Sequence, residues 1–232
     1  MIGTVAAWFC YDYLLDFLTR PMLGVMRQTQ TQFLLTTFPE AFMIQLQICV
    51  VAGIILTCPA LTIELWGFVA PGLTPEERRP LKWIVPLAAL LFVLGVVVCY
   101  LILPKAFEWF AMYIPSHTRL LPSLQQSLLF TLKMLLAFGI VFELPILLML
   151  LAKVGIVNSS FLLKNWRPAM VGISVISAII TPSNDAFSML MMAIPVSGLY
   201  FVSIALVRLV EVPSGTPGAV SRYIDRFKRG TR

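Results

Sequence analysis

The stretch LLAFGIVFELPILLMLL, residues 135–151, is apolar throughout except for one acidic residue, Glu143. It belongs to a longer apolar run, residues 124–152, which exceeds the roughly 20 residues that a helix needs to cross a bilayer. No residue within four positions of Glu143 carries a positive charge, and Lys133 is about 15 Å away along a helix. The stretch therefore predicts a membrane-spanning helix with an unneutralised carboxyl group near its middle.

Two neighbours of Glu143 disturb this helix. Pro145 has no backbone N–H, so the carbonyl of Val141 loses its helical partner. Gly139, one turn before Glu143, lets water or another helix approach. Because a charge at this depth costs about 2.5 to 3.5 kcal/mol, we expect Glu143 and Pro145 to form an intramembrane polar site facing protein or a water-filled concavity. The alternative is that Glu143 is a satisfied structural residue.

The composition indicates whether the chain as a whole lies in water or in a membrane. Of its 232 residues 59% are hydrophobic and 12% charged, and the mean hydropathy is +0.90. This is more apolar surface than a soluble core of this size can bury. The chain is therefore expected to be an integral membrane protein that contacts the lipid bilayer directly.

The apolar runs predict an all-α fold, a polytopic protein with six transmembrane helices, of which the fifth and sixth are short. The domain 1–212 would hold all six, and 213–232 would be a basic cytoplasmic tail. The fifth is too short to span alone without local thinning of the bilayer or burial against neighbours. The expected helices are residues 3–18, 42–66, 83–103, 124–152, 169–180 and 187–209.

The positions of Lys and Arg predict the orientation, because cytoplasmic loops are enriched in them. With the N-terminus inside, twelve of the 17 basic residues fall in inner loops and the tail, and four fall in outer loops. This favours an N-in, C-in arrangement. The net charge of +6 reflects this inner excess and does not indicate nucleic-acid binding, because no basic run is interleaved with aromatic residues outside the apolar spans.

The reactive residue types indicate no catalytic or metal centre. The four cysteines are scattered singly in apolar segments, and the only histidine, His117, lies in an expected outer loop. We therefore expect no enzyme activity, no metal and no cofactor. A small polytopic proton- or ion-coupled transporter using Glu143 and a purely structural assembly subunit remain alternatives to a receptor.

Four short motifs occur in one order among these spans. They are TTFPEAF at 36–42, WGFVAPGLTPEERR at 66–79, FGIVFELP at 138–145 and AIITPSNDAFSMLMMAIP at 178–195. In this combination the chain resembles the C subunit of the twin-arginine protein translocase, the TatC family, over residues 11–211. The resemblance implies a concave, glove-like bundle that binds twin-arginine signal peptides of folded cargo proteins.

The resemblance also implies where the signal peptide binds. Two adjacent guanidiniums are recognised best by carboxylates, through bidentate charge-assisted hydrogen bonds. The family's carboxylate before an arginine in the first inner loop corresponds to Glu77 before Arg78, with Glu76 as a rival one position away. Phe68 and Pro71 match the family's loop aromatic residue and proline, which would shape the pocket.

Further implications concern the outer surface and the partners. Phe38, Pro39, Glu40, Pro182 and Asp185 are expected in outer loops, where Asp185 is equally able to cap the last helix. Small residues in the fifth helix would admit single-span TatA/TatB-type subunits. The family further implies self-association and location in the cytoplasmic (inner) membrane, or in an organellar energy-coupling membrane.

One departure from the family concerns the start of the chain. Family members carry a cytoplasmic tail with acidic and arginine residues before the first helix, whereas this sequence opens with MIGTVAAWFCYDY. We therefore expect either a truncated or wrongly assigned start, or a protein without a second carboxylate for the signal's arginines.

Overall fold

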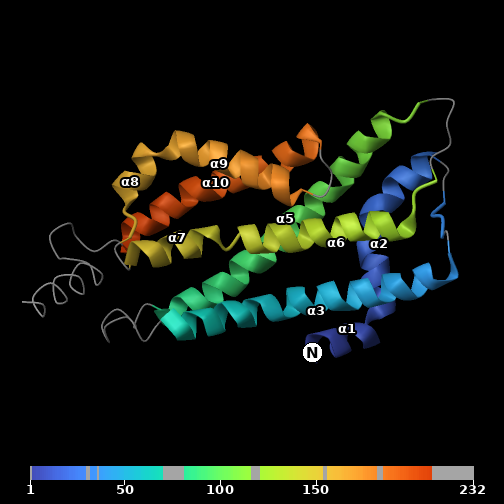
Figure 1. Ribbon diagram of the computed structural model, residues 1–232, viewed down its shortest axis with the longest axis horizontal. Helices are drawn as coiled ribbons and strands as arrows, with labels where there is room; N and C mark the ends of the chain where they lie inside the picture. Colours follow the sequence, from blue (N-terminus) through green and yellow to red (C-terminus); the bar gives the residue numbers. More distant parts are fainter. Residues whose placement is uncertain are drawn as a thin grey trace, which may run out of the picture.

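A computed structural model describes residues 2–29, 32–35, 37–69, 81–115, 121–153, 156–181 and 185–210 (Figure 1). Within these ranges the regular structure is helical, apart from an isolated parallel β-bridge between Leu34 and Ser123. The predicted all-α class is therefore confirmed for the described part of the chain. The helices are α1 (Ile2–Phe9), α2 (Tyr11–Thr29), α3 (Phe38–Val69), α5 (Leu81–Met112), α6 (Leu124–Val141), α7 (Leu144–Lys153), α8 (Ser159–Lys164), α9 (Trp166–Ile180) and α10 (Ala186–Val210).

Four candidate membrane spans are long and apolar enough to cross a bilayer. They are Phe38–Cys58, Pro86–Met112, Leu124–Ala152 and Ala186–Leu209, and α9 is a shorter apolar helix. The span formed by α6 and α7 is the most enclosed: 56% of its apolar 18-residue stretch is buried, against 28–39% of the corresponding stretches in the other three. The stretch that holds Glu143 is thus the centre of the bundle.

Glycines allow α5 and α6 to cross closely beside that stretch. A Cβ atom on Gly95 of α5 would lie 2.8 Å from the carbonyl oxygen of Phe138 and 2.7 Å from Cγ of Phe142. Reciprocally, a Cβ atom on Gly139 of α6 would lie 2.6 Å from Cε2 of Phe92. The contact is therefore one of backbone against aromatic ring on both sides, which only glycine permits without displacement.

The N-terminal region differs from the expected single helix over residues 3–18. Two helices, α1 and α2, meet at a bend at Cys10 (Figure 1). α2 is amphipathic because it carries the charged residues Asp12, Asp16, Arg20 and Arg27. Arg20 pairs with Asp16 at 2.7 Å. α1 packs against α3, where a Cβ on Gly53 would lie 2.7 Å from Oγ1 of Thr4. The predicted first span is thus divided between two helices.

Other boundaries also depart from the prediction. The helix expected to end at Leu103 continues through Pro104 to Met112, because a proline kinks a membrane helix without ending it when neighbouring groups compensate. The short helix α8 was not predicted. Its start is fixed by Asn158, whose side-chain oxygen accepts a hydrogen bond from the backbone N–H of Phe161 at 2.7 Å.

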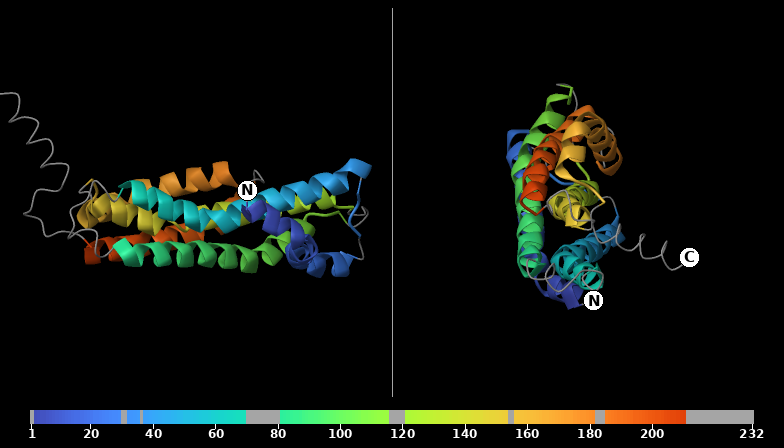
Figure 2. Two further views of the ribbon diagram at one scale, coloured as in Figure 1. Left: turned by 90° about the horizontal axis from the view of Figure 1, so that it is seen from below. Right: turned by 90° about the vertical axis from the view of Figure 1, so that its left-hand side faces the viewer.

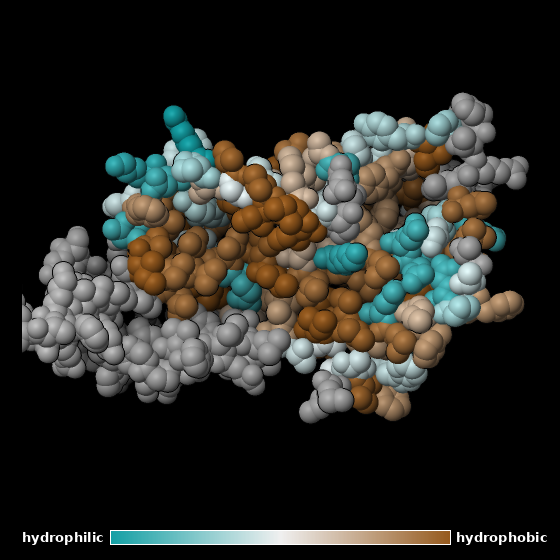
Figure 3. Space-filling model, viewed as in Figure 1, coloured by the Kyte–Doolittle hydropathy of each residue, from teal (hydrophilic) through white to brown (hydrophobic). Residues whose placement is uncertain are grey.

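The bundle is elongated, and its helices reach unequal heights along the long axis (Figures 1 and 2). We call the end where α3 and α6 begin and α2 and α5 finish the Glu40 end. α9 ends and α10 begins short of the Glu40 end, while α3 and α6 extend further toward it (Figures 1 and 2). Figure 3 shows the face that is seen in Figure 1: its surface is mainly hydrophobic across the middle, and hydrophilic residues gather toward both ends. The bundle therefore has one side that is shorter than the other.

Candidate functional site

Glu143 lies at a break in the fourth predicted span. α6 ends at Val141 and α7 begins at Leu144, so the expected continuous helix over residues 124–152 is interrupted. The N–H of Glu143 donates to the carbonyl of Ile140 at 3.1 Å, and its own carbonyl accepts from Ile146 and Leu147 at 3.0 Å each. Pro145 is buried in the first turn of α7, where its missing N–H costs little. The break places the glutamate on a tight turn between two helices.

The side chain of Glu143 has no hydrogen-bond partner among the described residues. Both carboxylate oxygens are buried, and the group interacts electrostatically with Cys58 of α3. Gly139 admits the ring of Phe92 from α5, so the expectation that another helix approaches there is confirmed. Buried polar groups are nearly always hydrogen-bonded, and each exception requires an explanation. The arrangement therefore leaves the hydrogen-bonding capacity of the Glu143 carboxyl group unused inside the bundle.

The predicted outer residues Phe38, Pro39 and Glu40 form the first turn of α3 instead of a loop. Phe38 is fully exposed, whereas Glu40 is only 6% exposed. Its Oε2 accepts from the N–H of Thr37 at 3.2 Å, as in a capping box, and its Oε1 accepts from the hydroxyl of Ser123 at 3.2 Å. The T-x-x-E spacing within TTFPEAF is the sequence pattern that predicts this cap.

Through Ser123, Glu40 joins the starts of two helices. The hydroxyl of Ser123 also accepts from the N–H of Gln126 at 3.4 Å and so caps α6. Beside it, Leu34 donates to the carbonyl of Pro122 at 3.0 Å and accepts from Leu124 at 3.2 Å. Glu40 is therefore a structural connection between α3 and α6, which its motif alone does not reveal.

Asp185 caps the last helix, which was one of the two alternatives predicted from the sequence. Its Oδ1 accepts from the N–H of Ser188 at 2.8 Å, directly before the start of α10. Pro182, which was expected in the same outer turn, lies outside the described residues.

Most of the expected signal-peptide site also lies outside the described residues. This applies to Pro71, Glu76, Glu77 and Arg78. Phe68 is in the last turn of α3, and its side chain is likewise not described. α3 ends and α5 begins at the end of the bundle opposite the Glu40 end.

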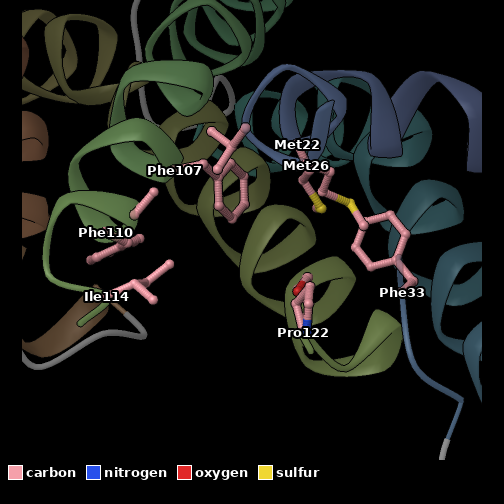
Figure 4. Close-up of a pocket in the computed structure, with 10 residues that line it drawn as sticks. Met22, Met26, Phe33, Phe107, Phe110, Ile114 and Pro122 are labelled. Atoms are coloured by element: carbon pink, nitrogen blue, oxygen red, sulfur yellow. The ribbon is translucent and has the colours of Figure 1, made fainter. Parts of the chain in front are cut away.

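A pocket near the Glu40 end was not predicted from the sequence. The cavity measures about 180 Å³ and lies between α2, the segment 32–35, and the ends of α5 and α6 (Figure 4). Spacings of three or four residues in α2 and α5 predict apolar faces, but nothing in the sequence shows that these faces leave a gap. Its lining is almost wholly apolar: Met22, Val25, Met26, Phe33, Phe107, Phe110, Ala111, Ile114, Pro122 and Ser127.

Comparison with known proteins extends these observations. A family model described as Sec-independent protein translocase protein (TatC) matches residues 1–195. The TatC protein of Carboxydothermus hydrogenoformans is 32% identical over 212 residues, which cover 91% of this chain and 86% of the relative. That of Desulforapulum autotrophicum is 38% identical over 204 residues, covering 88% and 75%.

A crystal structure described as the twin arginine translocase receptor TatC gives a TM-score of 0.75 at 31% identity, covering 90% of this chain and 91% of that one. Sequence similarity and fold thus agree over about nine-tenths of the chain, and the family model's range, residues 1–195, includes the four motifs quoted above. The chain belongs to the TatC family of Sec-independent protein translocase proteins and is a membrane subunit of a twin-arginine translocase.

Proposed function

We propose that this chain is the signal-peptide receptor and core subunit of a twin-arginine translocase that exports folded proteins across an energy-coupling membrane. Its similarity in fold and sequence to a crystallised twin-arginine translocase receptor carries the proposal. The subunit would act by binding and assembly, without a catalytic centre or cofactor. The alternative of a small transporter using Glu143 is not favoured by the comparisons.

The proposed arrangement has six spans with both termini inside. α1 and the first part of α2 would form the first span, and α9 the fifth. The Glu40 end would then face outward, and residues 213–232 would form the basic cytoplasmic tail after the membrane domain 1–212. The predominance of basic residues on the proposed inner side supports this orientation.

Thiol labelling tests the orientation. In a background without Cys10, Cys49, Cys58 and Cys99, we expect Leu121→Cys to react with an impermeant thiol reagent added to intact cells. Ser160→Cys should react only after the cells are made permeable. Both positions are exposed, so differences in burial do not explain the contrast. Labelling of Ser160→Cys in intact cells would reverse the topology.

The proposed signal-peptide site is the loop between α3 and α5. Glu77 would accept bidentate hydrogen bonds from one guanidinium of the signal's arginine pair, with Arg78 and Glu76 beside it. Phe68 and Pro71 would provide a surface for the apolar part of the signal peptide. The basic residues of the loop cannot attract the positively charged arginines of a signal peptide. The carboxylates of the loop must therefore bind them.

Substitutions in this loop test the proposal. Glu77→Lys is expected to reduce photocrosslinking of a twin-arginine signal peptide at least tenfold, since a lost charge-assisted hydrogen bond costs about 1.5 to 3 kcal/mol. Glu76→Lys is the matched control, with the same charge change one residue away, and should have a smaller effect. A larger loss with Glu76→Lys would move the site to that residue.

Partner subunits are proposed to dock on α9. Among the described helices α9 packs chiefly against α10, and it leaves Val171, Val175, Ile176 and Ile179 more than half exposed. Such an apolar, lightly covered helix suits single-span TatA/TatB-type subunits. Self-association in a larger receptor complex and location in the cytoplasmic (inner) membrane, or in an organellar membrane, complete the proposal.

A further inference from the structure

Lys133 is a charged residue on the exposed side of the most enclosed span. It lies nine positions after Leu124, about 14 Å along α6 from the Glu40 end. The structure gives it no ion pair with any described residue, and Glu143 is about 15 Å further along the chain. A lysine inside an apolar span requires a partner, water or a charged membrane surface.

An apolar stripe continues from Lys133 along the same face. Leu136 and Ile140 follow it at spacings of three and seven residues, which places all three on one side of the helix. Ile140 is 52% exposed, whereas Leu132 and Met134, which flank Lys133 on either side, are buried. Figure 3 shows isolated hydrophilic residues on the hydrophobic surface where α6 runs. Lys133 therefore lies at the start of an apolar strip made of the half-buried Leu136 and the exposed Ile140.

The short side of the bundle affects the depth at which Lys133 lies. α9 has 15 residues and is about 22 Å long, less than the roughly 30 Å of bilayer hydrocarbon. α9 ends and α10 begins well before the Glu40 end (Figures 1 and 2). A bilayer that adapts to α9 thins on this side, which brings its surface toward the level of Lys133.

We propose that Lys133 and this strip bind one phospholipid, with the lipid phosphate against the ammonium group and an acyl chain along Leu136 and Ile140. The ammonium is a strongly hydrated point charge, and a phosphate at the headgroup level lets it keep part of its hydration. A carboxylate from a partner helix would instead require both ions to be desolvated. The proposal needs only that the chain spans a membrane, and it is independent of the receptor role.

Photolabelling of the purified full chain in nanodiscs tests the proposal. Two probes carry the same photoreactive acyl chain, one on phosphatidylglycerol and one on a glycolipid without phosphate. We expect the phospholipid probe to label the strip around Leu136 and Ile140 about fivefold more than the glycolipid, which is the effect of one basic residue at a membrane surface. This comparison uses the unaltered protein and does not depend on a variant that folds.

Variants then assign the preference to one side chain. Lys133→Gln should remove the fivefold preference and Lys133→Arg should retain it. Lys105→Gln, which changes an exposed lysine paired with Glu108 on α5, should leave it unchanged. Signal-peptide binding, measured on the same nanodiscs, is expected to survive Lys133→Gln. Equal labelling by the two probes, or labelling that passes to a protein partner whenever one is present, would overturn the lipid site.

Discussion

Gly95→Ala is expected to lower the thermal stability of the protein strongly, although it adds a single methyl group. The new Cβ would lie 2.8 Å from the carbonyl oxygen of Phe138 and 2.8 Å from Cβ of Phe142, and neither backbone atoms nor a Cβ can move independently of α6. Overpacking of this kind costs about 1 to 3 kcal/mol. We expect a clear fall in the melting temperature of the purified protein in detergent.

Gly24→Ala is the matched control for this change. Gly24 also lies inside a helix, α2, but a Cβ there would meet no atom within 4 Å. Alanine is favoured over glycine in a helix by up to about 1 kcal/mol, so this variant should be as stable as the unaltered protein or more stable. Equal melting temperatures for Gly95→Ala and Gly24→Ala would show that the α5–α6 crossing is looser than the structure indicates.

Glu143→Leu is expected to abolish export while it stabilises the protein. Both carboxylate oxygens are buried without a hydrogen-bond partner among the described residues, and a charge at such depth costs about 2.5 to 3.5 kcal/mol. Removing it should raise the melting temperature. Signal-peptide binding should persist, because the proposed recognition loop lies at the far end of α3. Export of folded cargo is measured in a host whose own TatC protein has been deleted.

Glu143→Gln separates charge from hydrogen bonding. Near-normal export with glutamine would indicate a hydrogen-bonding or protonated role, and loss with both Gln and Leu would indicate that the ionised carboxylate is needed. Normal export with Glu143→Leu, together with the raised melting temperature, would mean that the glutamate is only a tolerated structural residue. A stability gain with loss of activity is the usual signature of a functional polar group.

The sequence predicted the apolar spans of this fold better than it predicted their internal breaks. Hydrophobic runs longer than 20 residues identify α3, α5 and α10 because the cost of lipid exposure depends on composition. The interruption at Phe142 and Glu143 was missed, because a proline permits a break without requiring one. Phe142, at the break, packs against Gly95 of α5, and such a contact between distant segments cannot be read from the local sequence.

The candidate site was predicted in part. Glu143 and Pro145 were identified from the sequence, since a charge in an apolar run is conspicuous. The connection of Glu40 to Ser123 was not, because it joins residues 83 positions apart. The recognition loop was assigned by resemblance to a family, as neighbouring acidic and basic residues in a loop also occur on ordinary solvated surfaces.

Binding of a signal peptide to the purified chain tests the central claim most directly. A labelled peptide with adjacent arginines should bind the chain in nanodiscs, and the same peptide with two lysines should bind at least tenfold more weakly, because lysine cannot form bidentate hydrogen bonds with a carboxylate. Fluorescence anisotropy at fixed salt gives both dissociation constants. Equal affinity for the two peptides, or no binding of either, would contradict the assignment of this chain as a twin-arginine signal-peptide receptor.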